Sequence, residues 1–123
     1  MRDNKTLVER RKHPRVNKAL SLKLSSLNAD LVTETKNISA SGVLCEVEHP
    51  LELFTKVKIT LLLPIRDSVA VKTKVVRVAC EGVVVRKDFI PEIQKFNIAI
   101  FFNRISKVAS EKLARYISCH TGI

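Results

Sequence analysis

Tryptophan is absent from this chain of 123 residues, tyrosine occurs once, and glycine and cysteine occur only three times each. The scattered glycines, Gly42, Gly82 and Gly122, exclude a Gly-rich loop of the kind that cradles phosphates. The cysteines are odd in number and far apart, which fits neither a disulfide framework nor a zinc site; they are Cys45, Cys80 and Cys119. The three histidines are equally scattered. We therefore expect no metal and no cofactor.

Long apolar runs are also missing. No segment approaches the ~18 residues of a membrane-spanning helix, and no hydrophobic stretch follows the charged N-terminus as in a secretory signal. We therefore expect no membrane span and a cytoplasmic location. The acidic residues mostly stand singly, so the sequence brings together no nucleophile, base and charge-stabilising group. We expect that the protein is not an enzyme.

Acidic residues are in deficit, with 12 Asp and Glu against 22 Lys and Arg, which gives a net charge of +10. Residues 1–18 hold seven basic and two acidic side chains, and so carry half of that charge. Such a field attracts anions: nucleic acid, nucleotides or an anionic membrane surface. Apolar residues make up 46% of the chain, which is enough for a packed core in one domain.

Period-two alternation of apolar residues dominates the middle of the chain and predicts strands with one buried face. The clearest stripes are Leu20, Leu22 and Leu24; Val43, Cys45 and Val47; Val57, Ile59, Leu61 and Leu63; and Phe96, Ile98, Ile100 and Phe102. A further strand is expected at residues 82–87. The apolar stripe changes parity near Val75–Val76, which predicts a β-bulge or a bend at a barrel corner.

Only the C-terminus has helical spacing. Ser106 is a suitable N-cap, and apolar residues recur every three or four positions from Ile105 to Ile117, so a helix is expected over residues 106–119. The predicted fold is all-β with one helix: a small six- to seven-stranded antiparallel β-barrel with a C-terminal α-helix. The single domain 1–123 would comprise a flexible basic arm (1–15), the barrel (16–102) and the helix (106–119).

The first candidate motif is Arg10-Arg11-Lys12-His13-Pro14-Arg15. Pro14 favours an extended chain, in which Arg11 and Arg15 point to one side roughly 13 Å apart. Arginine can grip a phosphate or the edge of a guanine with two parallel hydrogen bonds. The alternative is a solvated basic tail.

The second candidate motif is Asn37-Ile38-Ser39-Ala40-Ser41-Gly42, directly before the Val43 stripe. Asn37 and Ser39 offer short donors and acceptors on one side of an extended chain, suited to the polar edge of a base. Gly42 allows a positive φ or a close approach of the backbone to a ligand. The alternative is an ordinary turn between strands.

Together the two motifs resemble the PilZ domain family of cyclic di-GMP receptors, whose pattern is RxxxR followed by (D/N)xSxxG. Arg11–Arg15 supplies the first part and Asn37–Gly42 the second. The resemblance covers nearly the whole chain and implies a PilZ-like barrel, although Ala99 stands where the family's last strand usually has Gly. It further implies that Arg11 and Arg15 grip cyclic di-GMP, and that Asn37 and Ser39 bind guanine while Gly42 shapes the loop.

Two further residues enter through the resemblance alone. Arg10 directly precedes RxxxR. In the PilZ family, a basic residue at this position is associated with the binding of two nucleotides per chain. Arg77 is similar to a recurrent strand arginine of the family and is a candidate for the same site, with a solvated strand residue as the alternative. The function implied is a non-enzymatic receptor whose arm orders over the nucleotide and signals to a downstream effector protein.

Two other functions stay open from the sequence. A basic barrel could bind DNA or RNA through its arm, but such modules need exposed aromatic side chains for stacking, and this chain has few. Alternatively, the chain could be a PilZ domain that binds no ligand and acts as a protein-interaction module. The intact RxxxR and (D/N)xSxxG motifs argue against this alternative.

Overall fold

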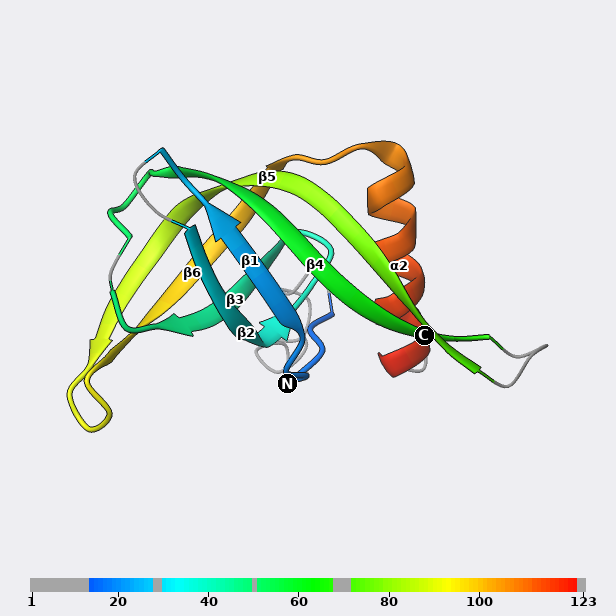
Figure 1. The fold of residues 1–123 in the computed structure, drawn as a ribbon, viewed down its shortest axis with the longest axis horizontal. Helices are drawn as coiled ribbons and strands as arrows, with labels where there is room; N and C mark the ends of the chain where they lie inside the picture. The colour runs from blue at the N-terminus through cyan, green and yellow to red at the C-terminus, as the bar shows by residue number, and fades with distance from the viewer. Residues whose placement is uncertain (1–13, 28–29, 50, 68–71, 122–123) are drawn as a thin grey trace, which may run out of the picture.

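The computed structural model describes residues 14–27, 30–49, 51–67 and 72–121. In that part of the chain, antiparallel strands close into a barrel in the order β1-β2-β3-β6-β5-β4, and a helix follows the last strand (Figure 1). The elements are β1 (Ser21–Ser25), β2 (Asp30–Ile38), β3 (Gly42–Val47), β4 (Lys56–Asp67), β5 (Lys72–Ile90), β6 (Lys95–Arg104) and α2 (Lys107–Thr121). The predicted fold class is confirmed.

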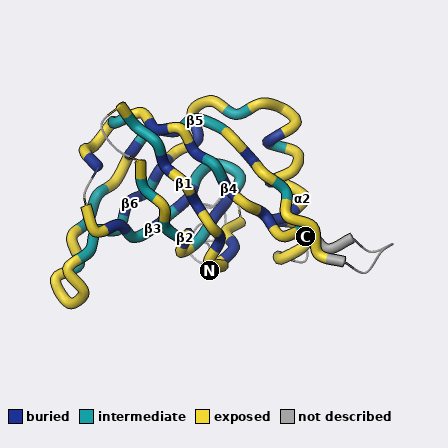
Figure 2. Tube along the Cα trace, in the orientation of Figure 1, coloured by how far each residue is buried: buried dark blue, intermediate teal, exposed yellow. Residues whose placement is uncertain are grey.

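The core follows from the alternation of apolar residues along the strands. Figure 2 shows buried and exposed positions alternating along much of the barrel. The predicted stripes are confirmed: every member is buried except Phe96, which is half-buried and packs against the core. Because each strand is hydrogen-bonded on both sides, the inward side chains of six strands meet in one apolar cluster.

Strand β5 differs from the prediction in two ways. It runs unbroken through residues 82–87, so these do not form a separate strand, and its register with β4 is continuous across Val75 and Val76. The predicted bulge at that point is wrong. Here β4 and β5 pair only with each other, as a ribbon that continues past the barrel (Figure 1). An apolar side chain on such a ribbon need not face a core, and Val75 is exposed.

Helix α2 begins and ends within two residues of the predicted bounds. The backbone N–H of Ala109 donates to Ser106 Oγ at 3.1 Å, so Ser106 is the N-cap as predicted. The helix packs on β4 and β5, and its inward residues join the barrel core; they are Ala109, Leu113, Tyr116 and Ile117. In the described part of the chain, no helix is long and apolar enough to cross a membrane.

Replacing the cap tests whether the helix end depends on it. We expect Ser106→Ala to lower the free energy of unfolding by about 1 kcal/mol, because the Ala109 N–H loses its acceptor. Urea denaturation followed by circular dichroism measures this. Ser110→Ala, one turn into the same helix, is the control and should change stability by less than about 0.5 kcal/mol. Equal effects of the two variants would contradict the capping role.

Candidate functional site

A short bridge between backbone atoms joins the two sequence motifs. Val16 N–H donates to Ile38 O at 2.8 Å, and Ile38 N–H donates to Val16 O at 3.0 Å. Both side chains are buried, so the neighbouring Arg15 and Asn37 are directed to the outer side of the sheet. The end of the basic segment therefore lies against the strand that carries Asn37.

A buried threonine strengthens this attachment. Thr35 Oγ1 accepts a hydrogen bond from the N–H of Leu20 at 3.0 Å and donates one to the carbonyl of Lys18. Thr35 is only 3% exposed, and its hydroxyl satisfies two backbone groups of the segment that leads into β1. Residues 16–20 are thus held along β2 at both ends.

A β-bulge in β2 decides the direction of Asn37. Thr33 and Thr35 lie on the inward side of the strand, so simple alternation would turn Asn37 inward as well. The register with β3 shifts between Thr35 and Asn37, where Lys36 is the extra residue. After the shift Ile38 faces the core, fully buried, and Asn37 faces outward.

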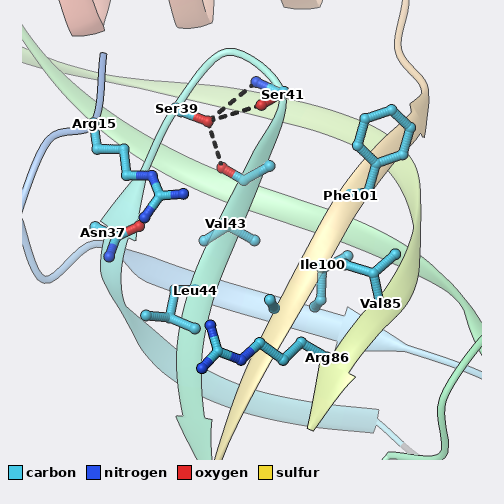
Figure 3. A pocket seen from close by; sticks show the side chains of 12 residues that line it. Arg15, Asn37, Ser39, Ser41, Val43, Leu44, Val85, Arg86, Ile100 and Phe101 are labelled. Atoms are coloured by element: carbon cyan, nitrogen blue, oxygen red, sulfur yellow. Dashed lines mark hydrogen bonds between the residues drawn. The ribbon is translucent and has the colours of Figure 1, made fainter. Parts of the chain in front are cut away.

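Hydrogen bonds close the turn between β2 and β3. The Ser39 N–H donates to Gly42 O at 2.9 Å, and Ser41 N–H donates to Ser39 Oγ at 3.2 Å. The two serine hydroxyls are 3.1 Å apart (Figure 3). Ser39 is 7% exposed, so its position is fixed by this turn.

Gly42 is required for a close approach between strands. A Cβ built on this residue would lie 2.3 Å from the carbonyl oxygen of Ile100 on β6. The sequence left open a positive φ or a close approach of the backbone to a ligand; the structure shows no positive φ at Gly42 and instead a close approach to the backbone of β6. The floor of the site is therefore the β3–β6 pairing.

A second bulge, in β5, directs Arg86 to the same face. Val84 faces inward opposite Ile100, and alternation would turn Arg86 inward too. The register with β6 shifts between Val84 and Arg86, so that Arg86 pairs with Ala99 and faces outward. The extra residue, Val85, is left 48% exposed.

These features surround a pocket of about 220 Å³ on the outer face of β2, β3, β6 and β5 (Figure 3). Arg15 and Asn37 lie on one side of it and Arg86 on another, with Leu44 and Ile100 between them. None of its lining residues is acidic. Arg86 Nε is paired with Asp88 at 2.5 Å, whereas Arg15 forms no ion pair with any described residue. The pocket is suited to an anion.

The structure brings together four of the seven residues that the sequence nominated: Arg15, Asn37, Ser39 and Gly42 all line the pocket. Arg10 and Arg11 lie outside the described residues. Arg77 is not in the pocket; it pairs with Leu62 on β4 and is exposed on the outer side of that sheet. The alternative for Arg77, a solvated strand residue, agrees with this placement.

Sequence reasoning missed the residues that line the other half of the pocket. Arg86, Val85 and Phe101 belong to no motif, and the parity of Arg86 predicts the wrong face because the bulge follows Val84. The polar run Arg86-Lys87-Asp88 after three valines is the one local sign that the alternation changes there.

The described residues that line the pocket include no histidine, cysteine or carboxylate. No group of three or more His, Cys, Asp or Glu among all the described residues could hold a metal ion. Burial, with Glu46 nearby, raises the pKa of the Cys45 thiol to about 12, and burial raises that of Cys80 to about 11. Such thiols are not nucleophiles at neutral pH, and neither lines the pocket. The pocket offers hydrogen-bond donors and positive charge, which suit binding.

Comparison with known proteins agrees with the geometry. Residues 9–118 match the family model described as PilZ domain. The chain belongs to the PilZ domain family. A search of curated proteins found no sequence match.

Two solved structures share the PilZ fold of this chain. The inhibitor of motility MotI/DgrA from Bacillus subtilis is 18% identical, with a TM-score of 0.74 over 87% of this chain and 49% of the MotI chain. The chain therefore spans about half of MotI. The PilZ domain of YcgR from Escherichia coli, solved with cyclic di-GMP, is 15% identical, with a TM-score of 0.63 over 90% of this chain and 91% of that chain.

The close approach at Gly42 can be tested directly. We expect Gly42→Ala to lower the free energy of unfolding by about 1–3 kcal/mol, because the added methyl must push β3 away from the Ile100 carbonyl. Chemical denaturation measures the loss. Lys23→Ala, at an exposed position of β1, adds no atom, serves as the control and should change stability by less than about 0.5 kcal/mol. A Gly42→Ala variant as stable as the parent would show that β3 and β6 are not in close contact there.

Proposed function

We propose that this PilZ domain is a non-enzymatic receptor for cyclic di-GMP and that the ligand binds in the pocket described above. The observation that carries the proposal is the meeting of Arg15 with Asn37, Ser39 and Gly42, residues from two motifs more than twenty positions apart. The YcgR domain that shares this fold was solved with cyclic di-GMP. The family and the pocket chemistry both support this ligand.

The chemistry of the pocket matches the ligand in charge and in hydrogen-bonding groups. Cyclic di-GMP carries two phosphates and two guanines, and each guanine offers the O6 and N7 acceptors that arginine binds with two hydrogen bonds. Arg15 has no acidic partner among the described residues, and the Asn37 amide can meet the polar edge of a base. Val85 and Phe101 supply apolar surface at the rim for a flat base.

Arg86 is a further candidate ligand residue. Its guanidinium is exposed and held only by Asp88, two residues away. An exposed pair of this kind contributes little, about 0–1 kcal/mol, so a phosphate or guanine can compete with the carboxylate for the guanidinium. Arg86 takes the place in the proposed site that the sequence assigned to Arg77.

The expected affinity is micromolar. A charge-assisted hydrogen bond contributes about 1.5–3 kcal/mol. Three or four of them, less the entropy of ordering residues 5–15, leave about −8 kcal/mol, which corresponds to a Kd near 1 μM. Arg11, four residues before Arg15, is expected to supply part of this energy.

We propose that ligand binding creates a surface for a downstream effector protein. The basic arm would order over the nucleotide beside the exposed Val85 and Phe101, so a partner would contact protein and ligand together. We expect this signalling to take place in the cytoplasm. MotI is described as an inhibitor of motility, but this chain spans only half of it.

Substituting the arginines one at a time tests the site. We expect Arg15→Ala to weaken cyclic di-GMP binding by at least about tenfold, and Arg86→Ala by several-fold, because each removes a charged donor to the ligand. Isothermal titration calorimetry measures both, with circular dichroism as a check on folding. Arg77→Ala is the matched control: it removes the same charge from the outer face of β5, away from the pocket, and should leave the affinity within twofold.

Parent-like affinity of the Arg15→Ala, Arg86→Ala double variant would place the site elsewhere. If Arg77→Ala weakened binding as much as Arg15→Ala, non-specific charge attraction would explain the binding. A steep loss of affinity between 50 and 200 mM salt would point instead to the nucleic-acid alternative, because counterion release scales with the number of phosphates contacted.

Stoichiometry tests the role of Arg10. We expect the parent chain to bind two cyclic di-GMP molecules and Arg10→Ala to bind one, because the family associates a basic residue at this position with a nucleotide pair. The molar ratio from the same titration measures it, and Lys12→Ala removes a nearby charge as the control. A ratio of one for the parent would remove Arg10 from the proposed site.

A further inference from the structure

A second hollow lies on the other side of the molecule, between the β4–β5 ribbon and the C-terminal half of α2. Its volume is about 420 Å³, larger than that of the pocket proposed for cyclic di-GMP and within the roughly 300–1,000 Å³ of small-molecule sites. It is lined by Pro64, Ile65, Thr73, Arg115, Tyr116, Cys119 and His120. None of these belongs to the PilZ motifs.

Tyr116 lines this cavity with its ring and its hydroxyl. The residue is 2% exposed, and no described residue pairs with its hydroxyl. Since no buried polar side-chain atom of the described residues lacks a partner, this hydroxyl is open to water in the cavity. Burial raises the pKa of Tyr116, so the hydroxyl keeps its proton at neutral pH and can donate to a ligand that displaces the water.

Arg115 adds a positive charge to the same cavity. It forms no ion pair with any described acidic residue, and none of the described residues that line the cavity is Asp or Glu. Arg115 is exposed, and its guanidinium offers five N–H donors and no acceptor, so an anion in the cavity can replace water as its partner.

His120 forms a wall of the cavity together with Tyr116. Their rings lie 4.2 Å apart between centroids at 34°, and His120 Nδ1 is 2.9 Å from the carbonyl oxygen of Tyr116. A carbonyl oxygen only accepts hydrogen bonds, so Nδ1 carries the proton and Nε2 remains for a ligand. The ring pair, with Pro64 and Ile65, gives the cavity apolar walls.

We propose that this cavity binds a small organic anion with a flat apolar body, such as an aromatic carboxylate. The carboxylate would accept hydrogen bonds from Arg115 and from the Tyr116 hydroxyl, and the apolar body would lie against Ile65 and the Tyr116–His120 ring pair. The excess of donors over acceptors selects an anion, and the apolar walls select against inorganic phosphate.

Such a ligand would join two elements of the fold. Tyr116 and Arg115 belong to α2, whereas Ile65 and Thr73 belong to the ribbon strands β4 and β5. A molecule bound between them would hold the helix against the ribbon. The site shares no residue with the pocket proposed for cyclic di-GMP, so either assignment can fail without the other.

The test is a titration of the full chain with 2-naphthoate, followed by ¹H–¹⁵N NMR, with 2-naphthamide as the uncharged probe of nearly the same shape. We expect saturable shifts of the Thr73, Arg115 and Tyr116 amides with 2-naphthoate, and at least about tenfold weaker binding of 2-naphthamide. Arg115→Gln should weaken 2-naphthoate by about tenfold and Tyr116→Phe by several-fold, because each removes a donor while keeping most of the side chain.

Lys112→Gln is the matched control, since it removes one positive charge from an exposed position of α2 that does not line the cavity. It should leave 2-naphthoate binding within twofold. Absence of saturable shifts at millimolar 2-naphthoate, equal binding of both probes, or equal effects of Arg115→Gln and Lys112→Gln would each overturn the proposal. The cyclic di-GMP titration of the same variants is a separate readout, and it should be unchanged.

Discussion

The pleat of a closed barrel assigns each side chain of a strand either to the core or to the outer surface, and the rest of the structure depends on this constraint. In the six strands here, most inward positions are filled by buried apolar residues, with Thr33 and Thr35 of β2 as polar exceptions, so a strand cannot slip by one residue without burying its polar face. The outer surface is therefore as strictly determined as the core. Only a bulge can move a residue from one side to the other, and bulges in β2 and β5 do this for Asn37 and Arg86.

The pocket is preorganised on its strand side. Asn37 is directed by the bulge, Ser39 is held by the turn, and Gly42 lets β3 approach the Ile100 carbonyl closely. The position of Arg15 is set by the Val16–Ile38 bridge, which fixes the backbone at the next residue. A ligand that meets groups already in place loses less free energy to ordering.

The fold places part of the net charge of +10 in two hollows of the surface. Both hollows are lined by arginine and have no Asp or Glu among the described residues that line them, yet their other walls differ. One is open, with serine and asparagine at its edge, and suits the polar edge of a nucleotide. The other is lined by Tyr116, Ile65 and Pro64, and suits an apolar body with a single charged group. The same excess of arginine thus supports two different kinds of recognition.

The sequence by itself determined the barrel, the helix and half of the pocket. Alternation is a local property, so the stripes such as Val57–Leu63 identified their strands, and Ser106 marked the helix start. RxxxR and (D/N)xSxxG named Arg15, Asn37, Ser39 and Gly42 because these residues lie in short continuous segments. The tertiary structure alone decided which strand arginine faces the pocket. Arg77 and Arg86 both follow a run of valines, so their local sequences do not show which of them faces the pocket. Arg86 faces it because of the bulge after Val84. That bulge arises from the pairing of β5 with β6, a contact between residues distant in the sequence that no local pattern records.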